Sequence, residues 1–173
     1  MKDFFFFLLC GIFSLVLQTT VFYLIPGTFH VDLILIIVVY LGFTRDVAWG
    51  GVLAFCLGYM MDIGSGGIPG TFSFSKFIVL LITATVAKRF FTKHPMFIFF
   101  LVFLFSLMDG LIMLGILRIQ GTWRVEGLDV GNVLLQAAAT GLIAPFVFAL
   151  LRRVDATMAK FLSKKTTEGR GWY

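Results

Sequence analysis

Long apolar runs separated by short polar segments make up most of the chain. They cover about 4–25, 28–43, 47–61, 71–87, 96–117 and 131–151. An α-helix rises about 1.5 Å per residue, so about twenty apolar residues cross a hydrocarbon core of roughly 30 Å. The second run is short and spans only if its helix begins near Thr28 or if the bundle is locally thin. The pattern predicts an all-α integral membrane protein, with six transmembrane helices in one bundle (1–151) and a basic amphipathic tail (152–173).

The composition supports this class. Hydrophobic residues make up 60% of the 173 residues, charged residues make up 13%, and 22 residues are phenylalanine. A soluble domain of this length has too little interior to bury so much apolar surface. Cys10 and Cys56 both lie in apolar runs without the spacing of a disulfide framework or a zinc site.

Lysine and arginine residues predict the orientation, because cytoplasmic loops carry the excess of these residues. With six spans, one side of the membrane receives only Arg118 and Arg124, and Lys76 lies within a span. Both termini are therefore predicted to be cytoplasmic. The opposite, cytoplasmic side receives Lys2, Arg45, Lys88, Arg89, Lys93, Arg152, Arg153, Lys160, Lys164, Lys165 and Arg170.

We expect no nucleic-acid partner, because basic residues do not gather around aromatic stacking platforms.

Three ionisable residues, Asp62, Lys76 and Asp109, fall where the hydropathy predicts lipid. A charge at membrane depth costs several kcal/mol unless it is paired or hydrated, so we expect these side chains to face one another or a cavity. Lys76 and Asp109 lie at similar depths, and Lys76 could reach either acid. The cluster is either an ion pair or triad that holds helices together, or the lining of a cavity for a proton, a small ligand or a partner side chain.

Small residues predict the faces on which helices approach closely. Gly50, Ala54 and Gly58 are four apart in the third run, and Ala137, Gly141 and Pro145 continue such a line in the sixth. Such faces allow close backbone contact in lipid, either within the chain or with another membrane protein. Pro145 removes a backbone hydrogen bond and is expected to kink or loosen its helix.

The tail carries a second pattern at helical spacing. Its apolar positions lie opposite the basic ones, so we expect the sixth helix to bend into an amphipathic segment at the membrane interface. The tail either remains solvated and fixes the topology, or it binds anionic lipid or a cytoplasmic partner. The apolar positions are Leu151, Val154, Met158, Phe161 and Leu162, and the basic ones are Arg152, Arg153, Lys160, Lys164 and Lys165.

No arrangement of residues predicts catalysis, a metal site or a cofactor. His30 and His94 fall on opposite sides of the predicted membrane, so they cannot share a metal or a proton relay. The serines lack a Gly-x-Ser-x-Gly elbow, and the Ser65-Gly66-Gly67 segment lacks a lysine at nucleotide-binding spacing. We therefore do not expect an enzyme.

Several segments resemble one known family. They are 31–42, the Gly50-Gly51 pair with Phe55 and Gly58, the run from Asp62 through Ser65, Gly66, Gly67, Pro69 and Gly70, and the ending 145–155. Together these segments are similar to the rod shape-determining protein MreD family, over nearly the whole chain. Asp62 with the Ser-Gly-Gly-x-Pro-Gly turn is the most specific part. Val31 stands where family members commonly have proline, which leaves the start of the second helix open.

The resemblance implies a subunit of the bacterial elongasome in the inner, cytoplasmic membrane. Proteins of this family bind the bitopic protein MreC, and through it the actin homologue MreB, the RodA glycosyltransferase and a class B penicillin-binding transpeptidase. Their role is that of a scaffold without a reaction of its own. Their fold is thought to be similar to the substrate-binding component of energy-coupling-factor transporters. The alternative function is therefore a solute-binding transport component, with a cavity lined by Asp62, Lys76 and Asp109.

The outer-face turn from Ser65 to Gly70 also has two interpretations. Its glycines, Gly66, Gly67 and Gly70 among them, supply backbone conformations that other residues resist, and this alone could explain the motif. The functional alternative is that the turn touches the periplasmic part of a partner.

Overall fold

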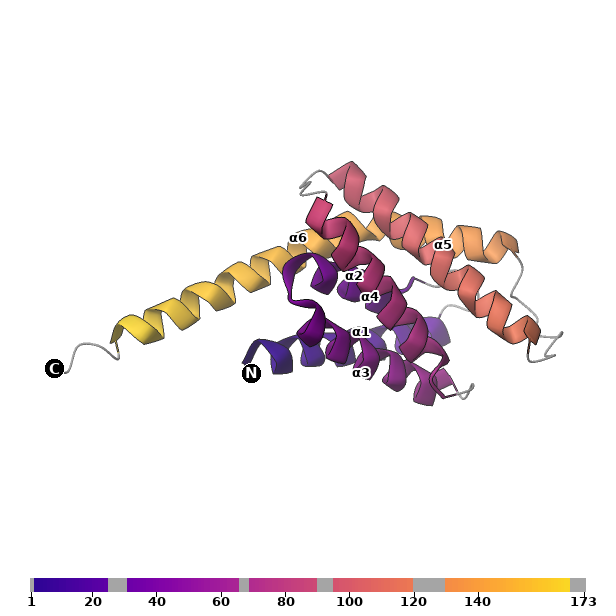
Figure 1. The fold of residues 1–173 in the computed structure, drawn as a ribbon. Coiled ribbons are helices and arrows are strands. Elements are labelled where there is room, and N and C mark those ends of the chain that lie inside the picture. The colour runs from indigo at the N-terminus through magenta and orange to yellow at the C-terminus, as the bar shows by residue number, and fades with distance from the viewer. Residues whose placement is uncertain (1, 25–30, 66–68, 90–94, 120–129, 169–173) are drawn as a thin grey trace.

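A computed structural model describes residues 2–24, 31–65, 69–89, 95–119 and 130–168 of the chain. These residues form α-helices only, and the helices are packed into one bundle (Figure 1). An all-helical fold is therefore confirmed. In chain order the helices are α1 (Lys2–Leu24), α2 (Leu33–Thr44), α3 (Val47–Ser65), α4 (Thr71–Arg89), α5 (Pro95–Ile119) and α6 (Val130–Glu168).

The start of α2 and the end of α3 lie several residues away from the ends of the expected spans. The second run was expected to span if its helix began near Thr28 or if the bundle was locally thin. Val31 and Asp32 are not helical and α2 begins at Leu33, while residues 28–30 lie outside the described part of the chain. The third helix was expected to end at 61, but α3 continues to Ser65. The reason in the first case is that the Asp32 side chain caps α2 and so ends the non-helical segment there.

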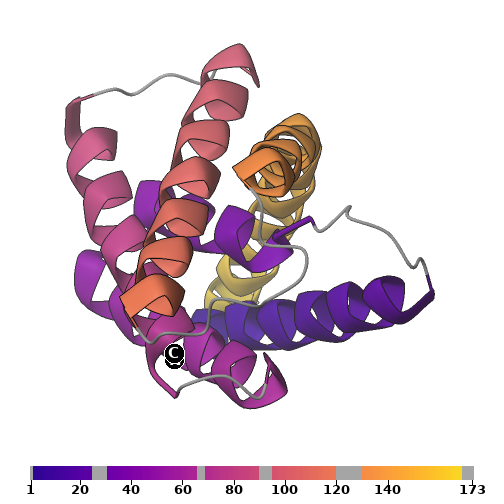
Figure 2. The ribbon, with the colours of Figure 1, turned by 90° about the vertical axis from the view of Figure 1, so that its right-hand side faces the viewer.

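Helix α2 is the centre of the bundle. It contacts every other helix, while the others make neighbouring pairs in the order α1, α3, α4, α5 and α6 around it (Figure 2). Residues 34–41 are consecutive and none is more than 2% exposed. A helix that is apolar on all sides is stable only when it is buried on all sides. The 12 residues of α2 span only about 18 Å, so this helix is a core element that is shorter than the hydrocarbon layer.

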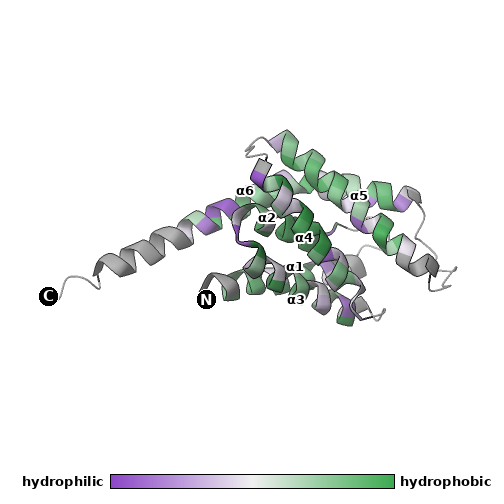
Figure 3. Cartoon of the chain, in the orientation of Figure 1, coloured by the Kyte–Doolittle hydropathy of each residue, from purple (hydrophilic) through white to green (hydrophobic). Residues whose placement is uncertain are grey.

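Four helices are long and apolar enough to cross a membrane, with windows Val47–Gly64, Thr71–Lys88, Pro95–Gly115 and Gly131–Thr157. Shorter apolar segments lie at Phe5–Thr20 and Leu33–Thr44. Apolar residues make up much of the bundle's helices (Figure 3), and some face outward, since Phe146 and Leu142 are 76% and 74% exposed. These features indicate a membrane-embedded protein, whereas six crossings and the orientation of the termini stay predictions.

The small residues singled out above lie at helix contacts within the chain. On α3, Gly50 and Gly58 are buried against α4, and a Cβ atom added to Gly58 would lie 2.5 Å from the Ser73 Cα atom. On α6, Gly141 is buried against α5, with the Phe99 carbonyl oxygen 3.3 Å from an added Cβ. Ala54 on α3 and Ala137 on α6 are fully buried. Pro145 lies inside α6 without ending it.

The predicted tail does not form a separate segment after residue 151. Helix α6 is one helix of 39 residues, and it continues past the bundle and beyond the N-terminal end of α1 (Figure 1). The physical reason is the sequence itself, because 146–168 contains neither glycine nor proline. Residues 152–168 of the predicted tail therefore belong to α6, and 169–173 lie outside the described residues.

Candidate functional site: a buried ion network

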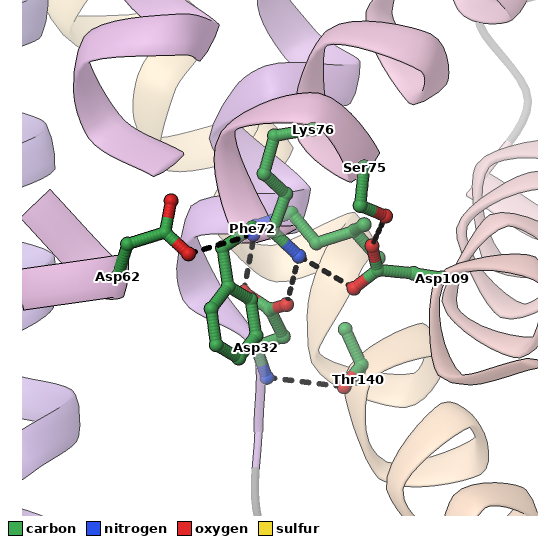
Figure 4. Close-up of polar contacts among 8 residues, drawn as sticks. Asp32, Asp62, Phe72, Ser75, Lys76, Asp109 and Thr140 are labelled. Atoms are coloured by element: carbon green, nitrogen blue, oxygen red, sulfur yellow. Dashed lines mark hydrogen bonds and ion pairs between the residues drawn. The ribbon is translucent and has the colours of Figure 1, made fainter. Parts of the chain in front are cut away.

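Lys76 is the centre of a polar network inside the bundle. It lies in the second turn of α4, and its side chain is fully buried. Its Nζ atom lies 2.6 Å from Asp109 Oδ2 on α5 and also pairs with Asp32 Oδ2 (Figure 4). One ammonium group thus receives two carboxylates from two other parts of the chain.

Asp32 connects this ion pair to the start of α2. Its Oδ1 atom accepts a hydrogen bond from the Leu35 backbone N–H at 2.8 Å, which is the usual bond of an N-cap residue. Its own backbone N–H donates to Thr140 Oγ1 on α6 at 3.2 Å. Asp32 therefore links α2, α4 and α6 at one point. The partial positive charge at the start of α2 also stabilises its carboxylate.

Asp109 is the most accessible member of the network. Its side chain is 13% exposed, compared with 5% for Asp32 and none for Lys76. Its Oδ2 atom pairs with Lys76, and its Oδ1 atom accepts a hydrogen bond from the Ser75 hydroxyl. The consecutive residues Ser75 and Lys76 thus both join α4 to the same carboxylate of α5.

Asp62 lies beside the start of α4 and binds its backbone. Its carboxylate on α3 accepts hydrogen bonds from the backbone N–H groups of Gly70, Phe72 and Ser73 at 3.0, 2.9 and 3.2 Å. The Ser73 hydroxyl adds a fourth bond at 2.8 Å. These are donors that a helix start leaves without intrahelical partners, so Asp62 caps α4 from the neighbouring helix. Of the ion pair or triad that the sequence left open, the described residues show Lys76 paired with Asp109, and with Asp32 as a second carboxylate.

The outer-face turn supplies the geometry for this cap. Ser65 is the last residue of α3, Gly66 and Gly67 lie outside the described residues, and Pro69 and Gly70 lead into α4. Gly70 has a φ of +100°, which side chains of L-residues rarely allow, so this position requires glycine. Because Gly70 itself has no side chain to cap α4, the Asp62 carboxylate provides the cap.

Asp32 was the network member that we did not single out as a site residue. A usable signal was present, since an aspartate directly before an apolar run and three residues before Leu35 fits an N-cap. The run after it is apolar on every side, which indicates full burial of α2 and hence of its cap. The two observations together would have placed Asp32 at membrane depth.

The network carries more potential negative than positive charge. Two carboxylates face one ammonium group, so the group has a net charge of about −1 when all three are ionised. The hydroxyl group of Ser75 and the backbone N–H of Leu35 at the start of α2 offset part of this charge. Chemically, the arrangement can hold α2, α4 and α5 in register, and it can accept a proton or a cationic group. In the described residues, no group of three or more histidine, cysteine, aspartate or glutamate side chains could hold a metal ion.

A second polar contact closes the other end of α2. The Arg45 Nη2 atom lies 2.6 Å from Asp155 Oδ1 on α6, and the Tyr40 hydroxyl donates to Asp155 Oδ2 at 3.2 Å. The Arg45 guanidinium also lies 5.3 Å from the ring centroid of Phe7 on α1. Ion pairs therefore tie both ends of the central helix to its neighbours.

The fold and these sites define a membrane-embedded helical protein whose short central helix is fixed at both ends by charged side chains. No family model, curated protein sequence or solved structure matches this chain.

Proposed function

We propose that this protein is a non-enzymatic membrane scaffold of the MreD type. In this role it binds an MreC-like bitopic protein and couples the MreB cytoskeleton to peptidoglycan synthesis during rod-shaped growth. The proposal rests on where the residues that carry the family resemblance lie in the structure. Asp32 pairs with Lys76 at the start of α2, and Asp62 with its glycine-rich turn caps α4.

A scaffold function is consistent with how the buried charges are used. Each carboxylate of the network already receives hydrogen bonds or an ion pair from another helix, so the polar groups hold the bundle together. The outside of α1, α5 and α6 stays apolar, with Phe13, Met96 and Phe146 all more than 60% exposed. Such faces can contact lipid or the transmembrane helix of another protein.

Solute binding is the second candidate function, and one observation favours it. The Asp109 side chain is partly exposed and lies in a group with surplus negative charge, near the start of a helix shorter than the membrane. In transporters, short or broken helices near the middle of the membrane often form solute and ion sites. The MreD resemblance implies a fold similar to the substrate-binding component of energy-coupling-factor transporters, which would fit this alternative.

Co-purification tests the two functions together. The full chain would be expressed with the MreC-like protein of the same organism, and as a control with a version whose transmembrane helix is replaced by an unrelated one. The scaffold proposal expects a stoichiometric complex with the first and a weak or absent complex with the second. Mass spectrometry of the purified protein would detect a retained small molecule. A retained solute without any bound MreC-like protein would contradict the scaffold proposal.

A further inference from the structure

Two arginines directly follow the last core residue of α6. Leu151 belongs to the apolar core, and the next two residues, Arg152 and Arg153, are exposed. The helix changes from apolar to hydrophilic residues where it leaves the bundle (Figure 3). The hydrocarbon core of a bilayer ends about 15 Å from its middle, and the lipid phosphate groups lie just beyond that boundary. The two guanidinium groups therefore stand at the depth of lipid phosphates.

The acidic residue closest to these arginines in α6 is already engaged. Asp155 is the only acidic residue of α6 before Glu168, and its carboxylate binds the end of α2 through an ion pair and a hydrogen bond. Glu168 lies about 22 Å further along the helix than Arg153. Within the described part of the chain, no ion pair joins Arg152 or Arg153 to a carboxylate. Both positive charges are thus available to an anion from outside the chain.

On the membrane side of Arg153, α6 carries an exposed apolar stripe. Leu142, Phe146 and Leu150 are 74%, 76% and 54% exposed. Successive members of this series, with Arg153 as the last, are four, four and three residues apart, so all of them share one side of the helix. From Leu142 to Arg153 the stripe is about 16 Å long, close to the roughly 15 Å of one hydrocarbon leaflet. This side of α6 matches a single lipid molecule in length and in the position of its charge.

We propose that this stripe and the two arginines bind one anionic phospholipid. Arg152 and Arg153 hold its phosphate through charge-assisted hydrogen bonds, and its acyl chains lie along the apolar stripe. The transmembrane helix of a partner fits this place less well. Such helices carry their own basic residues on the cytoplasmic side, where the end of α6 is predicted to lie, and would bring like charges together. The inference needs only a membrane-embedded chain and does not depend on the proposed MreC contact.

Native mass spectrometry of the full chain in detergent tests this site. Phosphatidylglycerol and phosphatidylcholine with identical acyl chains are added at equal concentrations, and we expect phosphatidylglycerol to be retained preferentially. Arg153→Gln should weaken its binding about fivefold, because one basic residue near an anionic headgroup contributes that much affinity. Replacing both arginines by glutamine should remove the preference. The matched control is Lys88→Gln, which removes one exposed positive charge at the end of α4 and should leave binding unchanged.

Three results would overturn the proposal. The first is equal retention of the two lipids by the unsubstituted chain. The second is an equal loss of binding in Lys88→Gln and Arg153→Gln, which would show attraction to the whole charged surface and no defined site. The third concerns the source of the phosphate. Glycerol phosphate, which has no acyl chains, should not displace the lipid at the same concentration, and displacement would mean that the arginines bind phosphate from solution.

Discussion

Lys76 shows what a single ammonium group does in the interior of a membrane bundle. Placing its charge in lipid would cost several kcal/mol, and two carboxylates from α2 and α5 offset this cost. Such a group is more informative about architecture than about stability, because a buried ion pair often stabilises no more than well-packed apolar residues would. Removing one partner is different, since it leaves a buried charge without compensation.

The first prediction concerns this asymmetry. Lys76→Ala leaves Asp32 and Asp109 facing each other without a cation, so we expect it to lower the unfolding free energy by about 3–5 kcal/mol. Adding Asp109→Asn should recover part of the loss, because it removes one of the two charges. Thermal unfolding in detergent measures both effects. Lys88→Ala, an exposed lysine on the same helix, is the matched control. Pairing with Asp109 would be refuted if the double variant were no more stable than Lys76→Ala.

The second prediction concerns Asp62. Asp62→Ala leaves the backbone N–H groups of Gly70, Phe72 and Ser73 without their acceptor, at a cost of about 1–3 kcal/mol for each buried group that stays unpaired. We expect faster hydrogen exchange at these amides, confined to the start of α4. Ser73→Ala removes only the hydroxyl bond and should have a smaller effect. If exchange in the two variants were equal, Asp62 would not be the cap.

At the residue scale, depth along the helices was enough to expect that Lys76 and Asp109 lie close together. Depth alone did not predict whether Asp62 pairs with Lys76 or caps a helix. A carboxylate near a helix start can do either, and tertiary geometry decides which. Asp32 was not singled out because it stands next to an apolar run, where an aspartate is usually the polar end of a membrane segment. Its burial depends on the other helices that surround α2.

At the scale of elements, the contact between α3 and α4 allows a sharp test. Gly58→Ala would place a Cβ atom 2.5 Å from Ser73 Cα and 2.8 Å from the Phe72 carbonyl oxygen. These are backbone atoms of α4, so no side-chain rotation can relieve the overlap. We expect a loss of about 1–3 kcal/mol in unfolding free energy, measured by thermal unfolding. Gly64→Ala on the same helix meets no atom within 4 Å and should change stability little. Equal effects of the two substitutions would contradict this packing.

Element positions followed from hydropathy where breakers mark the ends. The dense glycines and proline near 64–70 separated α3 from α4, and α5 begins within one residue of its expected start. The start of α2 did not follow from hydropathy, since Val31 before Asp32 is also apolar and the capping bond of Asp32 marks the boundary. The continuation of α6 was also missed. A change from apolar to amphipathic pattern at residue 151 indicates a new environment, but a helix ends only where the sequence breaks it.

At the scale of the whole molecule, the predicted orientation can be tested by labelling. In a chain with Cys10 and Cys56 replaced by alanine, Asp46→Cys marks the connection between α2 and α3, and Gly64→Cys marks the end of α3. An impermeant maleimide should label Gly64→Cys in intact cells and Asp46→Cys only after the membrane is opened. Both positions are exposed on the described surface. Labelling of both from the same side would refute the crossing of α3 and with it the six-span arrangement.

The central position of α2 has a consequence for the order of events during synthesis. Its two ends are joined to Thr140 and Asp155, which follow more than one hundred positions later in the chain. A ribosome therefore releases α1 to α5 before the partners of Asp32 and Arg45 on α6 exist. Until α6 is made, α2 lacks the polar contacts that fix its two ends. Long-range contacts of this kind form slowly. Maturation should thus depend on the final helix, and nascent chains that stop before it should be the preferred substrates of membrane quality-control proteases.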